Sequence, residues 1–192
     1  MQELKERIVK EGKVLPGNII KVDGFLNHRI DTGLLTRIAA EFGKYFNMDE
    51  VTMVLTAEAS GIALATAVAT YFHKPMIFAK KAKSDNIEGG LYQSDIYSYT
   101  YKKKVTLLVS KEWLSSDDKV LIIDDFMANG EAMRGLCDIV TAAGATLLGI
   151  GCAVEKGFQG GGDRLRAAGV NLKSLAIIES AEPGNIVFRD DD

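Results

Sequence analysis

The sequence predicts an α/β fold: a doubly wound, mostly parallel sheet of about five strands with helices between the strands. Two patterns predict it. Short apolar runs such as Val120–Ile123 are typical of strands that are buried on both faces of a parallel sheet. Each run is followed by a short loop and a segment of helical periodicity, so strands and helices alternate. A chain of 192 residues is most simply one domain.

The composition argues against several classes of partner. The net charge of −3 gives no overall attraction for nucleic acid or anionic lipid. Residues 1–10 are charged and amphipathic, unlike a signal peptide, and the longest apolar run, 61–72, is too short to span a bilayer. Cys137 and Cys152 lie in apolar surroundings without metal-ligand spacing, as expected for buried, reduced thiols. We therefore expect a cytoplasmic protein that binds neither membranes nor nucleic acid.

The first thirty residues predict a small region before the sheet begins. Residues 2–12 favour a short helix with an apolar face, which ends at Gly12. Residues 14–23 are predicted to be mostly extended, with a turn signal from Pro16 and Gly17. Residues 25–30 fit ordinary loop packing.

The predicted core begins with a helix, a strand and a second helix. Asp31 or Thr32 caps a helix to about Phe46, residues 51–56 form a buried strand, and residues 62–72 form the next helix. The loop Ala57–Gly61 joins the last two. A loop between a strand and a helix points free backbone N–H groups at an anion, although such glycine-containing turns are common.

A strand at 75–80 and a hairpin at 84–110 follow. The strand runs into Lys80, Lys81 and Lys83, which fit either a solvated edge or contact with an anion. Residues 84–90 are polar and glycine-rich, whereas 92–101 and 102–110 read as paired strands. The hairpin is either a structural element with a mobile tip or a lid that closes over a reacting centre.

The most informative stretch is 120–140. Asp124 and Asp125 follow the apolar run, then small residues at Ala128, Gly130 and Ala132 let a phosphate approach the main chain before a helix begins. Carboxylates accept hydrogen bonds from neighbouring hydroxyls, so a phosphate beside two carboxylates suggests a phosphorylated sugar. On spacing alone, the same pair would serve equally well to bind a metal or to cap the helix.

The remaining chain predicts a long buried strand at 145–155, a short helix within 160–169, and strands at 170–180 and 186–188. Lys156 follows the first of these strands, where an open α/β sheet binds ligands, although an exposed lysine is the commoner case. No strand is followed by GxGxxG, which argues against a dinucleotide-binding oxidoreductase.

The stretch 120–130 resembles the phosphoribosyl pyrophosphate (PRPP) signature of the type I phosphoribosyltransferases: four apolar residues, two acids, an apolar residue, two spacers, a small polar residue and Gly. Asn129 stands where many members have Thr. The strings Phe25–His28, Ser60–Ala63 and Val154–Gln159 extend the resemblance over the whole chain, toward bacterial members that act on xanthine.

The resemblance implies the type I phosphoribosyltransferase fold in one domain, 1–192. Its core would be roughly 31–156, its small hood roughly 1–30 and 157–192, and its lid the flexible hairpin. The implied activity is purine salvage: transfer of the 5-phosphoribosyl group of PRPP to N9 of xanthine, which gives xanthosine 5′-monophosphate and pyrophosphate, with weaker use of guanine. The enzyme would be a cytoplasmic homodimer. Mg²⁺ would be held by substrate oxygens and water rather than by the protein alone, with Asp124 and Asp125 in its outer shell.

The resemblance also assigns site residues. Asp124 and Asp125 are the catalytic carboxylates that hold the ribose hydroxyls, and Lys156 donates to the purine O6, which disfavours adenine. Hypoxanthine and guanine remain alternative bases, and a purine- or PRPP-sensing regulator of the same fold is the alternative to an enzyme. The predicted contacts are Ala128, Asn129, Gly130, Glu131 and Ala132 for the 5′-phosphate; Glu58, Ala59, Ser60, Gly61 and Lys81 for pyrophosphate; and Ile20, Asn27, Phe126 and Lys156 for the purine.

Overall fold

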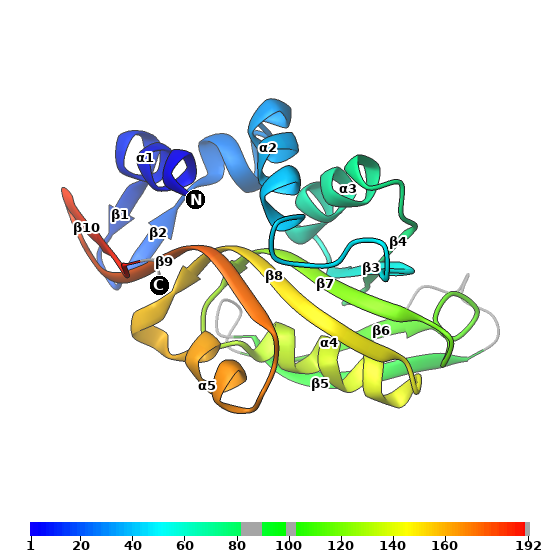
Figure 1. The fold of residues 1–192 in the computed structure, drawn as a ribbon. Coiled ribbons are helices and arrows are strands. Elements are labelled where there is room, and N and C mark those ends of the chain that lie inside the picture. Colours follow the sequence, from blue (N-terminus) through cyan, green and yellow to red (C-terminus); the bar gives the residue numbers. More distant parts are fainter. Residues whose placement is uncertain (82–89, 99–102, 191–192) are drawn as a thin grey trace.

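A computed structural model describes residues 1–81, 90–98 and 103–190. Its centre is a six-stranded sheet in the order β10–β9–β8–β7–β3–β4 (Figure 1). Neighbouring strands from β9 to β4 are parallel, and β10 is antiparallel to β9. The mostly parallel sheet is therefore confirmed, with an antiparallel edge strand. The bounds are β3 Met53–Ala57, β4 Met76–Ala79, β7 Lys119–Met127, β8 Thr146–Lys156, β9 Leu172–Glu182 and β10 Asn185–Phe188.

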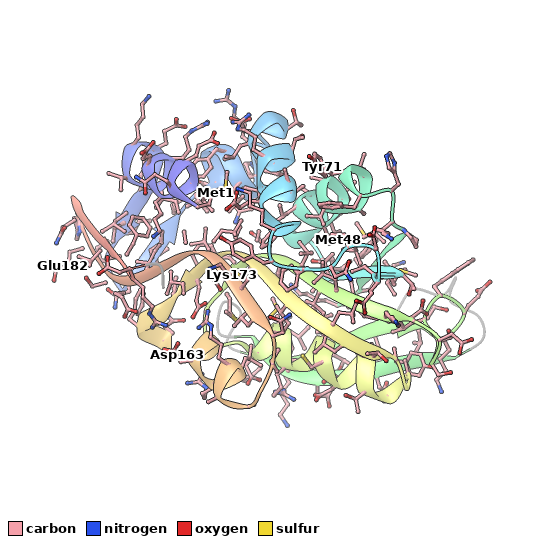
Figure 2. All side chains as sticks on the ribbon, in the orientation of Figure 1. Met1, Met48, Tyr71, Asp163, Lys173 and Glu182 are labelled. Atoms are coloured by element: carbon pink, nitrogen blue, oxygen red, sulfur yellow. The ribbon has the colours of Figure 1, made fainter. Side chains whose placement is uncertain are left out.

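Helices cover both faces of this sheet, as a doubly wound fold requires (Figure 1). One face carries α1, α2 and α3, and the other carries α4, α5 and an antiparallel hairpin of β5 and β6. Side chains fill the space between the sheet and both layers (Figure 2). The bounds are α1 Gln2–Glu11, α2 Thr32–Phe42, α3 Gly61–Tyr71, α4 Glu131–Ala142, α5 Gly161–Ala167, β5 Leu91–Ser98 and β6 Lys103–Ser110.

Strand β7 explains why its sequence is apolar without alternation. Leu121 and Ile123 pack in the cluster that includes α2 and α3, whereas Val120 and Ile122 pack in the cluster that includes α4 and the hairpin. Successive side chains of a strand point to opposite faces, so a central strand between two helical layers needs apolar residues at every position.

Two predicted boundaries were wrong. Strand β7 does not end before the carboxylates but continues to Met127, because Phe126 and Met127 stay paired with Val154 and Glu155 of β8. Helix α2 ends at Phe42 rather than near Phe46. There the N–H of Tyr45 donates to the carbonyl of Phe42, an i to i−3 bond that tightens the last turn.

The region before α2 folds into an antiparallel ribbon and one π-helical turn. Strands β1 (Lys13–Leu15) and β2 (Ile19–Lys21) form the ribbon, and the turn Asp23–Asn27 buries Phe25 and Leu26 completely. The terminal ammonium of Met1 donates to the carbonyl of Leu175 on β9 over 2.5 Å, so the chain start lies on the C-terminal strands. The division into a hood and a core stays a prediction. Within the described residues, no helix is long and apolar enough to cross a membrane.

Candidate active site

A cleft of about 500 Å³ opens where the parallel strands β3, β7 and β8 end. Open α/β sheets bind ligands at this edge. The walls come from the loop after β3, the loop after β7, the end of β8, the region before α2, and the hairpin. The lining residues are Ile20, Asn27, Ala57, Glu58, Ser60, Lys81, Ile96, Tyr97, Val105, Asp124–Met133 and Lys156.

The structure brings together all the predicted site residues except Ala59 and Gly61, which do not line the cleft. Ala59 is exposed beside the cis peptide Glu58–Ala59. Gly61 is buried at the start of α3, where a Cβ would clash with Thr56 Oγ1 and Asp124 Oδ1. Gly61 therefore allows α3 to approach the Asp124 carboxylate closely. The ligand contacts assigned to these residues stay predictions.

The loop Ala128–Ala132, here called the phosphate loop, has the geometry of an anion site. Gly130 precedes α4 with a left-handed backbone (φ 80°), which glycine adopts without strain. Among the described residues, no acceptor meets the N–H groups of Asn129 and Gly130. The first N–H groups of α4 are also free of partners within the helix, as at every helix start. These donors and the helix dipole favour a bound anion.

Asp124 and Asp125 are both buried, at 6% and 1% exposure. Burial, and then the charge of neighbouring Asp125, raises the pKa of Asp124 well above its usual range. The backbone N–H of Asp125 donates to Asp124 Oδ1 over 3.0 Å. Asn27 Nδ2 donates to Asp125 Oδ2 over 2.7 Å, so the π-helical turn is tied directly to the carboxylate pair.

Lys156 and Phe126 both line the cleft and lie close to each other. The Lys156 ammonium lies 5.5 Å from the Phe126 ring centroid and donates to the carbonyl of Asn18 over 3.0 Å. Burial lowers the pKa of Lys156. An ammonium has three donors, so the bond to Asn18 leaves two for a ligand that lies on the ring.

The loop after β3 is joined to the strand that carries the lysines. Glu58 Oε1 accepts from the backbone N–H of Lys81 over 2.6 Å. Lys80 also exchanges backbone hydrogen bonds with Leu108 of β6, which attaches the hairpin to the end of β4. This arrangement brings Glu58, Ser60 and Lys81 to one wall of the cleft.

The hairpin residues of the cleft were missed as site residues. Ile96, Tyr97 and Val105 line it, and the backbone N–H of Tyr97 donates to Glu131 Oε2 over 3.3 Å. The Arg134 guanidinium, which bonds Glu131, lowers the pKa of that carboxyl. The alternation of apolar and polar residues in 92–101 indicated that one face of the hairpin packs against the rest of the protein. The predicted mobile segment 84–90 lies almost wholly outside the described residues.

Comparison with known proteins agrees with this geometry. The family model described as a phosphoribosyl transferase domain matches residues 27–168. Xanthine phosphoribosyltransferase of Lachnoclostridium phytofermentans is 52% identical over 193 residues, covering all of both chains. The protein of the same name from Bifidobacterium longum strain NCC 2705 is 52% identical over 192 residues, with 98% of this chain and all of that one covered.

Solved structures add the fold. Adenine phosphoribosyltransferase of Giardia lamblia, complexed with 9-deazaadenine, superposes with a TM-score of 0.77 at 20% identity and covers 93% of this chain and 98% of its own. Adenine phosphoribosyltransferase of Trypanosoma brucei superposes with a TM-score of 0.72 at 22% identity, and the match covers 91% of this chain and 79% of that one. The predicted type I fold is thereby confirmed. The cleft, the family match and the full-length relatives agree, and the chain belongs to the phosphoribosyltransferase family.

Proposed function

We propose that this protein transfers the 5-phosphoribosyl group of PRPP to N9 of xanthine, which releases pyrophosphate and forms xanthosine 5′-monophosphate. The observation that carries the proposal is the cleft itself. An anion-binding loop, two buried carboxylates, and a lysine over an aromatic ring line one cavity. The full-length relatives at about half identity bear the name of this activity.

The phosphate loop and the carboxylates suit the sugar part of PRPP. The free N–H groups of Asn129, Gly130 and the α4 start bind the 5′-phosphate. Asp124 and Asp125 accept hydrogen bonds from the ribose hydroxyls. Cleavage of the bond from C1 to pyrophosphate leaves positive charge on the ribose, which the adjacent carboxylates stabilise. The chemistry therefore needs positioning and electrostatics rather than a protein nucleophile.

The other end suits a 6-oxopurine. The base lies on Phe126, and Lys156 donates to O6. Adenine has an amino group there, which would leave the ammonium facing a donor. Asn27 Nδ2 donates to Asp125 Oδ2, which orients the amide with its nitrogen toward the carboxylate. The second hydrogen on Nδ2 stays available to donate to the 2-oxo group of xanthine at the far edge of the base, beside Ile20.

The pyrophosphate part suits the remaining wall, where Glu58, Ser60 and Lys81 line the cleft. Ala59 and Gly61 of the same loop complete the proposed set of contacts. Among the described residues no group of three His, Cys, Asp or Glu side chains gathers to hold a metal. The donor set fits Mg²⁺ in another way: Asp124 is a buried carboxylate of raised pKa beside Asp125, and a cation nearby would favour its charged form. When bound, Mg²⁺ neutralises charge on the pyrophosphate.

Further assignments belong to the proposal: the lack of nucleic-acid binding rests on the net charge of −3, and the others rest on the resemblance. The enzyme is a cytoplasmic homodimer of purine salvage, and it binds no nucleic acid. Residues 1–192 form one domain, with a core of roughly 31–156 under a hood from roughly 1–30 and 157–192. The bond between Lys156 and the ribbon carbonyl of Asn18 supports a hood that reaches the base site.

A panel of bases tests the proposal. Purified protein, PRPP and Mg²⁺ are incubated with xanthine, guanine, hypoxanthine and adenine, and kcat/KM is compared. We expect xanthine to be preferred and guanine to be used more weakly. Lys156→Ala should lower kcat/KM for xanthine about 100-fold, because O6 loses a charged donor in a half-buried site.

Lys44→Ala, at an exposed ion pair with Glu41 after α2, is the matched control and should change nothing. Preference for hypoxanthine or guanine would correct the substrate. No turnover with any base, while PRPP still binds, would exclude the enzyme and favour a PRPP-sensing regulator.

A further inference from the structure

We propose that the first turn of α5 is a positioning element for the phosphate loop, and that Arg164 orients the peptide that presents its N–H to the 5′-phosphate. The proposal rests on the proposed function of that loop. The sequence of residues 160–169 predicted only a turn and a short helix, and none of these residues lines the cleft. Their contacts nevertheless reach the loop and a buried ion pair behind it.

Gly161 touches the phosphate loop main chain directly. A Cβ on Gly161 would clash with Ala128 O and would lie 2.6 Å from the carbonyl carbon of Asn129 and 2.7 Å from the nitrogen of Gly130. The helix start therefore lies flat against the peptide between Asn129 and Gly130. Such close contact between two backbones is open only to glycine.

Arg164 fixes the direction of that same peptide. Arg164 Nη2 donates to the carbonyl oxygen of Asn129 over 3.0 Å. In a trans peptide the C=O and the following N–H point in opposite directions. The bond therefore holds the C=O toward α5 and turns the Gly130 N–H away from it, where no protein acceptor among the described residues meets it. A flipped peptide would present an oxygen to the phosphate instead.

The helix is itself anchored to the sheet by buried charge. Glu155 of β8 is fully buried and receives two bonds from Arg166 of α5, at 3.1 and 2.6 Å, and one from the Ser174 hydroxyl. A Cβ on Gly162 would clash with the Glu155 carboxylate. Removing one partner of such a pair leaves an uncompensated buried charge, so the pair holds α5 in one place.

A second attachment comes from Arg189, the residue that follows β10. Asp163, labelled in Figure 2 on α5, receives bonds from Arg189 at 2.7 and 3.0 Å. Helix α5 is thus bonded both to β8 and to the chain beyond β10. Because its first turn contacts the phosphate loop, these bonds also fix the position of that loop. Glu155 precedes Lys156, so the same anchor also fixes the strand end that carries the base-site lysine.

The test compares two ligands by calorimetry in the presence of Mg²⁺: ribose 5-phosphate, which occupies the phosphate loop, and pyrophosphate, which does not. Arg164→Met should weaken ribose 5-phosphate about fivefold, since one solvated charged hydrogen bond is lost, and leave pyrophosphate unchanged. Arg37→Met is the matched control: Arg37 is similarly exposed and bonds Glu3 between α2 and α1. It should change neither ligand.

Arg164→Lys restores a single cationic donor and should recover most of the affinity. Gly161→Ala should weaken ribose 5-phosphate more than Arg164→Met does. A merely structural role would lower the melting temperature and weaken both ligands alike. Unchanged ribose 5-phosphate binding in Arg164→Met, equal loss of both ligands, or no binding by the unaltered protein would each overturn the proposal. Unaltered protein that binds ribose 5-phosphate but turns over no base would instead overturn the proposed function alone.

Discussion

The two ends of the cleft are built in different ways. The end proposed to bind ribose and phosphate comes from one continuous stretch, Asp124–Ala132, at the end of β7 and the start of α4. The end proposed to bind the base is assembled from two segments near the start of the sequence, β2 and the π-helical turn, and from two later strands, β7 and β8. Each of these segments contributes one residue to the lining of the cleft: Ile20, Asn27, Phe126 and Lys156.

Under the proposed function, this difference separates the end that stabilises the reacting ribose from the end that selects the base. The continuous end depends on local backbone geometry, which a strand, a glycine with positive φ and a helix start impose wherever they occur together. The base end depends on how the region before α2 sits on the sheet. Two hydrogen bonds fix that position at the cleft, from Lys156 to Asn18 and from Asn27 to Asp125. Asp125 links the two ends, because it belongs to the continuous stretch and accepts the hydrogen bond from Asn27.

Asp125→Ala should produce the largest loss of activity, because it should affect both ends of the cleft. The change removes an acceptor for the ribose and frees the Asn27 amide at once. We expect kcat/KM for xanthine to fall about 100- to 1000-fold, the cost of losing a well-placed group at a developing charge. Steady-state kinetics with varied PRPP and varied base would measure it.

Asp125→Asn is the matched variant. Its amide oxygen still accepts from Asn27, so the base preference should survive while turnover falls. If Asp125→Ala kept the base preference of the unaltered protein, Asp125 would not position Asn27, and the two ends would be independent.

Asn27→Ala should have a smaller effect that is confined to the base end. The loss of one hydrogen bond to the base should lower kcat/KM for xanthine about tenfold and leave the KM for PRPP unchanged. The ratio between xanthine and guanine should move toward one. Asn47→Ala, at an exposed amide that bonds Glu50 after α2, is the control. A rise in the KM for PRPP would contradict the assignment of Asn27 to the base.

The same difference explains what could be predicted from the sequence. The alternation of strands and helices, the hairpin and the phosphate loop are local patterns, and the structure confirms their form. The extent of β7 past the carboxylates was not predictable, because Asp124 and Asp125 are poor strand formers on their own. They stay in the strand since Phe126 and Met127 pair with β8.

The contacts across the chain had no local signal. The bond from Asn27 to Asp125 joins residues 98 positions apart, and the bond from Arg164 to Asn129 joins residues 35 apart. The glycines at 160–162 indicated only a turn. Their role in close backbone packing depends on what lies opposite, which tertiary structure alone determines. Ile96 and Val105 likewise reach the cleft through the pairing of β5 with β6.

The smallest predicted effect concerns Asp124, where we expect stability and activity to change in opposite directions. Asp124 has a raised pKa, so the folded protein keeps this proton to a higher pH than the unfolded chain does. As the pH rises above the ordinary range of a carboxyl, the unfolded state releases its proton first, and the free energy of unfolding falls. Asp31 is the opposite case: its bond from the Leu34 N–H lowers its pKa, and its contribution is lost as the pH falls.

Asp124→Asn should therefore stabilise the ligand-free protein at pH 7 by about 1 kcal/mol while lowering activity, the pattern of a residue kept for function at a cost in stability. Urea unfolding at pH 5 and pH 7 measures it, and the gain over the unaltered protein should be larger at pH 7. Asp31→Asn should be destabilising at pH 7, and its deficit should shrink as the pH falls below the carboxyl range. An equal or lower stability of Asp124→Asn at pH 7 would mean that other interactions already compensate the burial of this carboxylate. The continuous end would then not reduce the free energy of unfolding.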